Sequence, residues 1–216
     1  MAIRHTRSVK IAISFYTDNG TLGYTSGKYD KDHIMQTDHR MYGHPVAPED
    51  ATGKLKEVYD SLEEMLGGIM PHVQIHATHA LEEMKCFTDP MKLTRNHPEV
   101  PLLWFAFMRI YVATKENYPY CIALNTAMLR KSGITERQIK AFTEDPTKIP
   151  LDKKLTLLLL KAVKSIYDSH HFTQKDFDEL YKTGYSDQTI YQIISYSTGF
   201  SGIARRLNTY LVKEQA

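Results

Sequence analysis

Apolar residues recur at every third or fourth position along most of the chain after Pro48, and this spacing predicts amphipathic α-helices. The first helix is expected between Leu55 and Leu66, and the second is expected to begin after Pro71 and to run past Met84. No low-complexity linker interrupts the pattern, which therefore predicts one mainly α-helical domain. Further helices are expected over about residues 100–114, 119–132, 135–144, 155–166, 173–183 and 186–211.

The first 47 residues follow a different pattern, in which apolar and polar side chains alternate over Val9–Phe15. A period of two is typical of a β-strand, and the Asn-Gly pair that follows is a strong turn signal. These features predict a β-hairpin over about residues 8–27, with an extended polar arm after it. The expected organisation is an N-terminal hairpin or arm over residues 1–47, followed by a helical domain over residues 48–216.

The segment over residues 100–114 carries apolar residues on nearly every side of its predicted helix. Such a helix is either buried on all sides within one domain or covered in part by a second subunit. The sequence alone leaves both alternatives open.

The composition is that of an ordinary globular protein, with 42% apolar and 24% charged residues among 216. The formal charge is +2 and no long run of Lys or Arg occurs, so nothing indicates a nucleic-acid partner. The longest apolar run, Leu155–Leu160, is far too short to span a bilayer, and the N-terminus lacks the apolar segment of a secretory signal. The two cysteines, Cys86 and Cys121, are too few for a disulfide framework. A cytoplasmic protein without a membrane partner is therefore expected.

Cys121 is the first candidate for chemistry, because it lies near the start of the helix expected to begin near Pro119. The unpaired N–H groups and the positive end of a helix favour a thiolate. Asn125 lies one turn later on the same face, so an activated cysteine would have a polar neighbour. The alternative is that Cys121 is a small core residue, as cysteines in apolar helices usually are.

The residues around Cys121 also resemble a known family. The run Tyr118-Pro-Tyr-Cys121, with Asn125 four residues later and Gly133-Ile-Thr-Glu after the helix, resembles the signature of the alkylhydroperoxidase D-like and carboxymuconolactone decarboxylase proteins. The resemblance covers about residues 48–212, from a lead-in helix near Asp50 to a long last helix. It implies an all-α alkylhydroperoxidase D-like fold and a homo-oligomer, often a trimer or hexamer. No cofactor is expected.

The departures from the family pattern bear directly on function. Redox-active members of the family carry Cys-x-x-Cys-x-x-x-His and an upstream glutamate. At the corresponding positions this chain has Tyr118, Cys121, Asn125 and, for the glutamate, Ala106. Dithiol turnover needs a resolving thiol, which only Cys86 could supply, and an asparagine is no general base near neutral pH. The resemblance therefore implies a protein that is not a dithiol peroxidase.

Tyrosine is abundant, with 14 residues, and several tyrosines lie close to Cys121 in sequence. A tyrosine gives a pocket an apolar wall with a polar tip. The functional interpretation is a small-molecule pocket, and the alternative is a core or a subunit interface. The pocket would be lined by Trp104, Met108, Tyr118 and Tyr120.

Two further groups of basic side chains are candidates for ligand binding. His72, His76 and His79 share one face of a predicted helix, where imidazoles at such spacing can hold a zinc-like ion. No carboxylate lies in register with them, so an exposed histidine face is the favoured interpretation and no metal is expected. Arg205 and Arg206 in the last helix could bind a carboxylate or phosphate, but a salt bridge is favoured.

Three functions are consistent with these observations. The first is a carboxymuconolactone decarboxylase-like protein that binds or acts on a small organic molecule without dithiol redox, with Cys121, Asn125 and Tyr118 at the site. The second is a one-cysteine hydroperoxide or thiol oxidoreductase, in which Cys121 is oxidised to a sulfenic acid and resolved by an external thiol. The third is a non-catalytic homo-oligomeric assembly protein.

Overall fold

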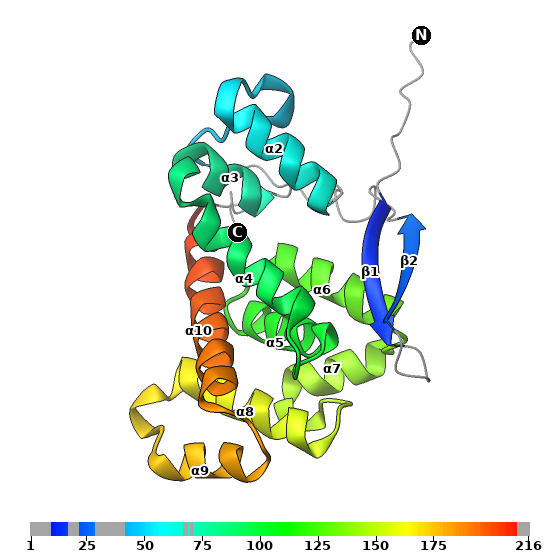
Figure 1. Cartoon of the computed structure of the whole chain (residues 1–216), viewed down its shortest axis with the longest axis vertical. Helices are drawn as coiled ribbons and strands as arrows, with labels where there is room; N and C mark the ends of the chain where they lie inside the picture. The colour runs from blue at the N-terminus through cyan, green and yellow to red at the C-terminus, as the bar shows by residue number, and fades with distance from the viewer. Residues whose placement is uncertain (1–9, 17–21, 29–41, 67–68, 70, 211–216) are drawn as a thin grey trace, which may run out of the picture. The chain divides into compact units, whose positions relative to one another are not determined.

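The structure is a computed structural model of the 216-residue chain and describes residues 10–16, 22–28, 42–66, 69 and 71–210. Most of these residues are helical, as the sequence predicts (Figure 1). The chain groups into two compact units, Met1–Thr88 with Tyr210–Ala216 and Asp89–Thr209. The predicted boundary at residue 48 falls inside the first unit and stays a prediction. No helix among the described residues is long and apolar enough to cross a membrane.

The first unit contains two short strands, β1 (Lys10–Tyr16) and β2 (Leu22–Lys28). They pair antiparallel, with Lys10 opposite Lys28 and Tyr16 opposite Leu22. The Asn-Gly turn and the arm after the second strand lie outside the described residues. The predicted hairpin over residues 8–27 therefore stays a prediction as a whole.

The helices of the first unit are η1 (Pro48–Asp50), α2 (Gly53–Leu66), α3 (Pro71–His79) and η2 (Leu81–Glu83), followed by the start of α4 (Met84–Asn96). Tyr59 of α2 is buried between these helices, with 2% of its surface exposed. Its hydroxyl donates to the Val46 carbonyl at 3.0 Å, and the Gln74 side chain of α3 donates to the same oxygen at 3.1 Å. These bonds tie the chain before α2 to both helices.

The prediction of one continuous helix after Pro71 and past Met84 is wrong. The backbone leaves the helical region at Ala80, where φ is −142° and ψ is 48°, and the single turn η2 leads into α4. Alanine is the strongest helix former, so the sequence carries no local signal for this break. The helix break is therefore set by packing.

The second unit continues α4 and adds α5 (Leu102–Lys115), α6 (Pro119–Lys131), α7 (Glu136–Glu144), η3 (Pro146–Lys148), α8 (Lys153–Tyr167), η4 (Ser169–His171), α9 (Gln174–Lys182) and α10 (Asp187–Tyr210). Their positions confirm the helices predicted from residue 100 onward (Figure 1). The antiparallel pair α5 and α6 and the long helix α10 hold the candidate site.

The predicted helix ends are formed by local interactions. Thr135 and Gln138 make a capping box at α7, with the Thr135 N–H donating to the Gln138 side chain at 2.9 Å. At α9 the rings of Phe172 and Phe177 lie 5.1 Å apart and form a hydrophobic staple. Gly133 follows α6 with φ of +82°, a conformation that favours glycine.

Helix α5 forms the centre of the second unit. Every residue from Trp104 to Ala113 is buried except Arg109. Of the two alternatives that the sequence left open for this helix, burial within the chain itself is therefore the one observed. A single charged side chain interrupts an otherwise apolar, buried segment.

A buried carboxylate joins α8 to α9. Asp176 is 4% exposed and accepts hydrogen bonds from Lys161 at 2.6 Å, Lys164 at 2.8 Å and the Thr173 N–H at 2.7 Å. Burial alone would raise the pKa of Asp176, but the bonds from the two lysines and from Thr173 outweigh it and hold that pKa well below its ordinary value. The negative charge is thus neutralised within the protein.

Candidate functional site

The turn between α5 and α6 positions the three residues that the sequence singles out. Tyr118 is the N-cap residue of α6 and Pro119 occupies its first turn, where the missing N–H has no cost. Cys121 and Asn125 follow one turn apart, on the side of α6 that is buried. The structure therefore brings Tyr118, Cys121 and Asn125 together, as expected.

Cys121 is a protonated, buried thiol. It is 5% exposed. Burial raises the pKa of Cys121 from 9.0 to about 12, although the charge of Arg109 and the neighbouring Tyr118 phenol act in the opposite direction. The sequence suggests that the positive end of α6 would lower the pKa of Cys121 and favour a thiolate, but the effect of burial on this pKa is larger. The other cysteine, Cys86 on α4, is exposed, and both are free thiols.

Tyr118 is equally removed from solvent, with 1% of its surface exposed. Burial, together with the neighbouring Cys121 and Tyr120, raises the pKa of the Tyr118 phenol far above its ordinary value. The phenol therefore keeps its proton near neutral pH and is not a base. Neither group of this pair ionises near neutral pH.

Asn125 is fully buried and uses both ends of its amide. Its Nδ2 donates to the Cys121 carbonyl at 2.8 Å, and its Oδ1 accepts from Arg109 Nε at 2.8 Å. A guanidinium can only donate, so the amide oxygen must face Arg109. At the position where the resembled motif has a histidine, this chain therefore has a neutral acceptor bound to a cation.

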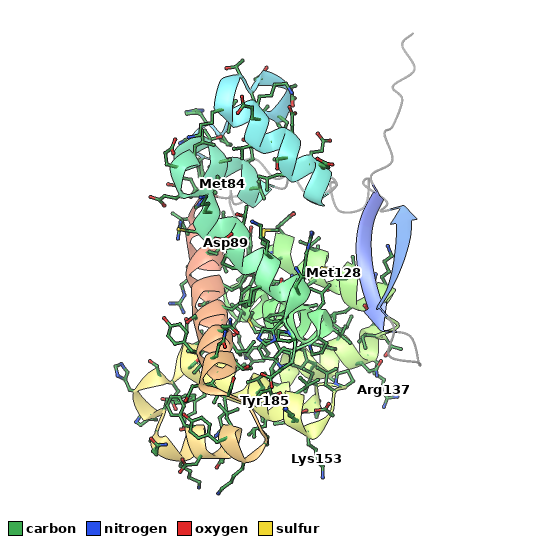
Figure 2. All side chains as sticks on the ribbon, viewed as in Figure 1. Met84, Asp89, Met128, Arg137, Lys153 and Tyr185 are labelled. Atoms are coloured by element: carbon green, nitrogen blue, oxygen red, sulfur yellow. The ribbon has the colours of Figure 1, made fainter. Side chains whose placement is uncertain are left out.

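Arg109 lies beside these residues, although no sequence motif singles it out. Besides Asn125, its guanidinium donates to the Tyr196 hydroxyl at 3.1 Å and lies 3.9 Å from Met128 Sδ. Met128, which is labelled in Figure 2, belongs to α6. No carboxylate among the described residues pairs with Arg109. A signal was present, because Arg109 is the only charged residue between Val100 and Thr114.

The expected pocket residues divide between two places. Trp104 and Met108 are fully buried in the main hydrophobic core, and the Trp104 indole donates to the Leu155 carbonyl at 3.0 Å. Tyr120 is 3% exposed and its ring centre lies 6.1 Å from that of Tyr118. Of these four residues, the two tyrosines lie outside that core cluster, as Cys121 does.

The histidines and the last arginines were the remaining candidates. His76 and His79 lie on α3, and the side chain of His72 lies outside the described part of the chain. Among described residues, no group of three His, Cys, Asp or Glu side chains is placed to hold a metal ion. Arg205 forms a two-pronged salt bridge with Glu116, with both N–O distances at 2.9 Å, which confirms the favoured interpretation for that residue.

The site offers binding chemistry and no obvious base. Its polar groups are a neutral thiol, a phenol, an amide and one guanidinium. The guanidinium can donate hydrogen bonds to a ligand, whereas none of the four groups accepts a proton readily near neutral pH.

Comparison with known proteins extends this picture to the fold. No protein-family model matches the chain, and no curated protein matches its sequence. An uncharacterized peroxidase-related protein from Ralstonia eutropha JMP134, described as an alkylhydroperoxidase AhpD core, superposes with a TM-score of 0.59 at 18% identity, over 78% of this chain and 92% of that one. An uncharacterized peroxidase-related protein from Silicibacter sp. TM1040 superposes with a TM-score of 0.63 at 17% identity, over 80% and 90% of the two chains. The chain therefore has the alkylhydroperoxidase D-like fold, which confirms the helical part of the predicted fold class.

Proposed function

We propose that this chain binds or acts on a small organic molecule beside Cys121, Asn125 and Tyr118, as carboxymuconolactone decarboxylase-like proteins do, and that it is not a dithiol peroxidase. The observation that carries the proposal is the state of Cys121. Its thiol is buried beside Tyr118, a phenol at the position where the resembled motif has its first cysteine. A thiolate is the nucleophile in thiol redox chemistry, and burial works against its formation here.

The same observation weighs against the one-cysteine oxidoreductase. Oxidation to a sulfenic acid follows thiolate character and exposure, and Cys121 has neither. The group that remains available is Arg109, which is partly exposed and donates hydrogen bonds. It supports binding of a polar ligand group without a redox step.

Thiol labelling tests this proposal with a control inside the same chain. Native protein is treated with iodoacetamide and analysed by peptide mass spectrometry. We expect rapid modification of exposed Cys86 and protection of buried Cys121 until the protein is unfolded. We also expect no catalysed consumption of an alkyl hydroperoxide in the presence of a dithiol.

Two outcomes of the hydroperoxide assay would contradict the proposal. Hydroperoxide consumption that persists in Cys86→Ser but disappears in Cys121→Ser would reject the proposal and support the one-cysteine oxidoreductase. Consumption lost in both variants would instead indicate a dithiol mechanism.

We also propose that the chain assembles as a homo-oligomer through the solvent-facing side of α10. From Gln188 to Ala204 this helix has no charged residue, and Tyr191 in that segment is 73% exposed. A side chain added at Gly199 or Gly202 would meet nothing within 4 Å in the single chain. An uncharged exposed helix face that includes a large aromatic residue is typical of a surface covered by a partner.

Sedimentation velocity tests the assembly. Tyr191→Lys is expected to shift a trimer or hexamer toward the monomer, whereas Tyr42→Lys, at a tyrosine that is 58% exposed in the other unit, is expected to leave the assembly unchanged. A monomeric wild-type chain, or an unchanged assembly in Tyr191→Lys, would reject this interface.

A further inference from the structure

The strongest unexplained feature of the second unit is the placement of Arg109. It is the only residue between Trp104 and Ala113 that is not buried, and the only charged one. A charge that is partly withdrawn from water is costly unless it is paired. Asp176 in the same unit shows the usual solution, with lysine partners at 2.6 and 2.8 Å. Arg109 has no such partner among the described residues.

The contacts of Arg109 orient the guanidinium without neutralising it. Nε donates to Asn125 Oδ1 at 2.8 Å and Nη1 donates to the Tyr196 hydroxyl at 3.1 Å. Nη2 faces Met128 Sδ at 3.9 Å, and a thioether is only a weak acceptor. All three partners are neutral. N–H groups on the two terminal nitrogens are therefore left for an oxygen acceptor from outside the described chain.

We propose that Arg109 is the anion-binding residue of this site and that its ligand is a small organic monocarboxylate, held by the paired terminal nitrogens. This inference rests on the proposed function and names the ligand class. The two oxygens of a carboxylate match the fork of a guanidinium and accept two parallel hydrogen bonds. Asn125, which is fully buried, fixes the direction of the fork from the opposite side.

The surroundings indicate what the rest of the ligand is like. The ring of Tyr196 packs edge-on against Phe105 at 5.1 Å and stacks with Phe200 at 6.5 Å. Tyr196, Phe200 and Met128 are all only partly buried, so an apolar surface adjoins the cation. A ligand with a carboxylate and a short apolar or aromatic body fits this combination.

The charge at the site favours a monoanion over a phosphate ester. Arg109 contributes one positive charge, and its described contacts are an amide, a phenol and a thioether. A phosphate ester carries close to two negative charges near neutral pH and is commonly bound by several cationic groups. One guanidinium balances one carboxylate.

Isothermal titration calorimetry on the full chain tests the inference with matched probes. The probes are acetate, hexanoate and phenylacetate, each paired with its neutral amide, and inorganic phosphate. We expect at least one of the longer acids to bind about thirtyfold more tightly than its amide, because the amide lacks the charge that strengthens both bonds. Phosphate is expected to bind more weakly than that acid.

Three variants assign the effect to Arg109. Arg109→Gln is expected to abolish the preference for acid over amide, and Arg109→Lys to weaken acid binding about tenfold by losing the fork. Arg137→Gln, at an exposed arginine on α7 that is labelled in Figure 2, is the control and is expected to bind like the wild type. Circular dichroism verifies that each variant is folded, and the lysine variant keeps the positive charge at this position.

Equal binding of acid and amide, no binding of any acid, or an Arg109→Gln variant with wild-type affinity would each overturn the inference. Tighter binding of phosphate than of every carboxylate would overturn the ligand class. None of these outcomes depends on Cys121, so the inference fails separately from the proposed function, which is rejected by hydroperoxide turnover instead.

Discussion

Asp176 and Arg109 are charged side chains in the same unit of the protein, but only Asp176 has a described counter-charge. Asp176, at the junction of α8 and α9, is 4% exposed and lies between two lysine ammonium groups. Arg109, on α5, is half-buried and contacts an amide, a phenol and a thioether. The first charge is balanced within the chain, and the second is oriented but has no described counter-charge.

The difference separates a structural role from a binding role. A buried ion pair with full hydrogen bonding holds elements together, and removing one partner leaves the others uncompensated. A cation that the fold orients without neutralising is instead ready for an anion from outside. Matched changes of each charge to an amide should therefore have unequal effects on stability.

The largest expected effect is that of Asp176→Asn. This change leaves Lys161 and Lys164 without the carboxylate that they share, and we expect the free energy of unfolding to fall by about 3 kcal/mol. Urea unfolding at pH 7 measures it. A loss below about 1 kcal/mol would show that Asp176 is not a structural charge.

The next effect concerns alkaline pH and Cys121. Because burial raises the pKa of Cys121 from 9.0 to about 12, its contribution to stability is complete below pH 9 and is lost as the pH rises toward 12. The unfolding free energy should fall by up to about 1.4 kcal/mol per pH unit in this range. Urea titrations between pH 8 and pH 10 on the wild type and on Cys121→Ser measure the difference.

The serine variant should lose most of this slope between pH 8 and pH 9, below the unfolded-state pKa of 10.0 from which tyrosines with raised pKa values, such as Tyr118, begin to contribute. Equal slopes in the two proteins would mean that Cys121 is more accessible than the structure shows.

A smaller effect is expected for Arg109→Gln in the absence of ligand. Removing a partly desolvated charge that has no counter-charge offsets the loss of its hydrogen bonds to Asn125 and Tyr196. We expect the free energy of unfolding to change by less than about 1 kcal/mol. A loss as large as that of Asp176→Asn would assign Arg109 a structural role.

The smallest effect is expected at the exposed salt bridge of Arg205. The hydrogen bond from Arg205 is the main reason that the pKa of Glu116 lies below its ordinary value. In Arg205→Gln the pKa of Glu116 should rise toward that ordinary value, with little loss of stability because solvent screens the Arg205 end of the pair, which is 61% exposed. A pH titration followed by carboxyl-carbon NMR measures the shift, and an unchanged pKa would contradict the assignment.

Local features of this fold could be predicted from the sequence. The capping box at Thr135, the staple between Phe172 and Phe177, and the Ser186 cap, which accepts the Thr189 N–H at 3.1 Å, all depend on residues within a few positions of one another. The break at Ala80 could not be predicted, because no nearby residue signals it.

The candidate site was only half predictable for the same reason. The turn from Tyr118 to Asn125 has a local signature, and the sequence placed these residues together. The partnership of Arg109 with Asn125 and Tyr196 joins α5, α6 and α10, over separations of 16 and 87 residues. A period of 3.6 gives the faces of each helix but not which faces meet, so the burial of Cys121 and the orientation of Arg109 emerged only from the structure.

The most direct test of the contrast between the two charges is the thermal unfolding midpoint of three proteins, each measured with and without the tightest-binding carboxylate. A ligand that binds only the folded state raises the midpoint by mass action. The account predicts that saturating carboxylate raises the midpoint of the wild type and of Asp176→Asn by similar amounts, and leaves that of Arg109→Gln unchanged. A midpoint of Arg109→Gln that rises as much as that of the wild type would contradict it.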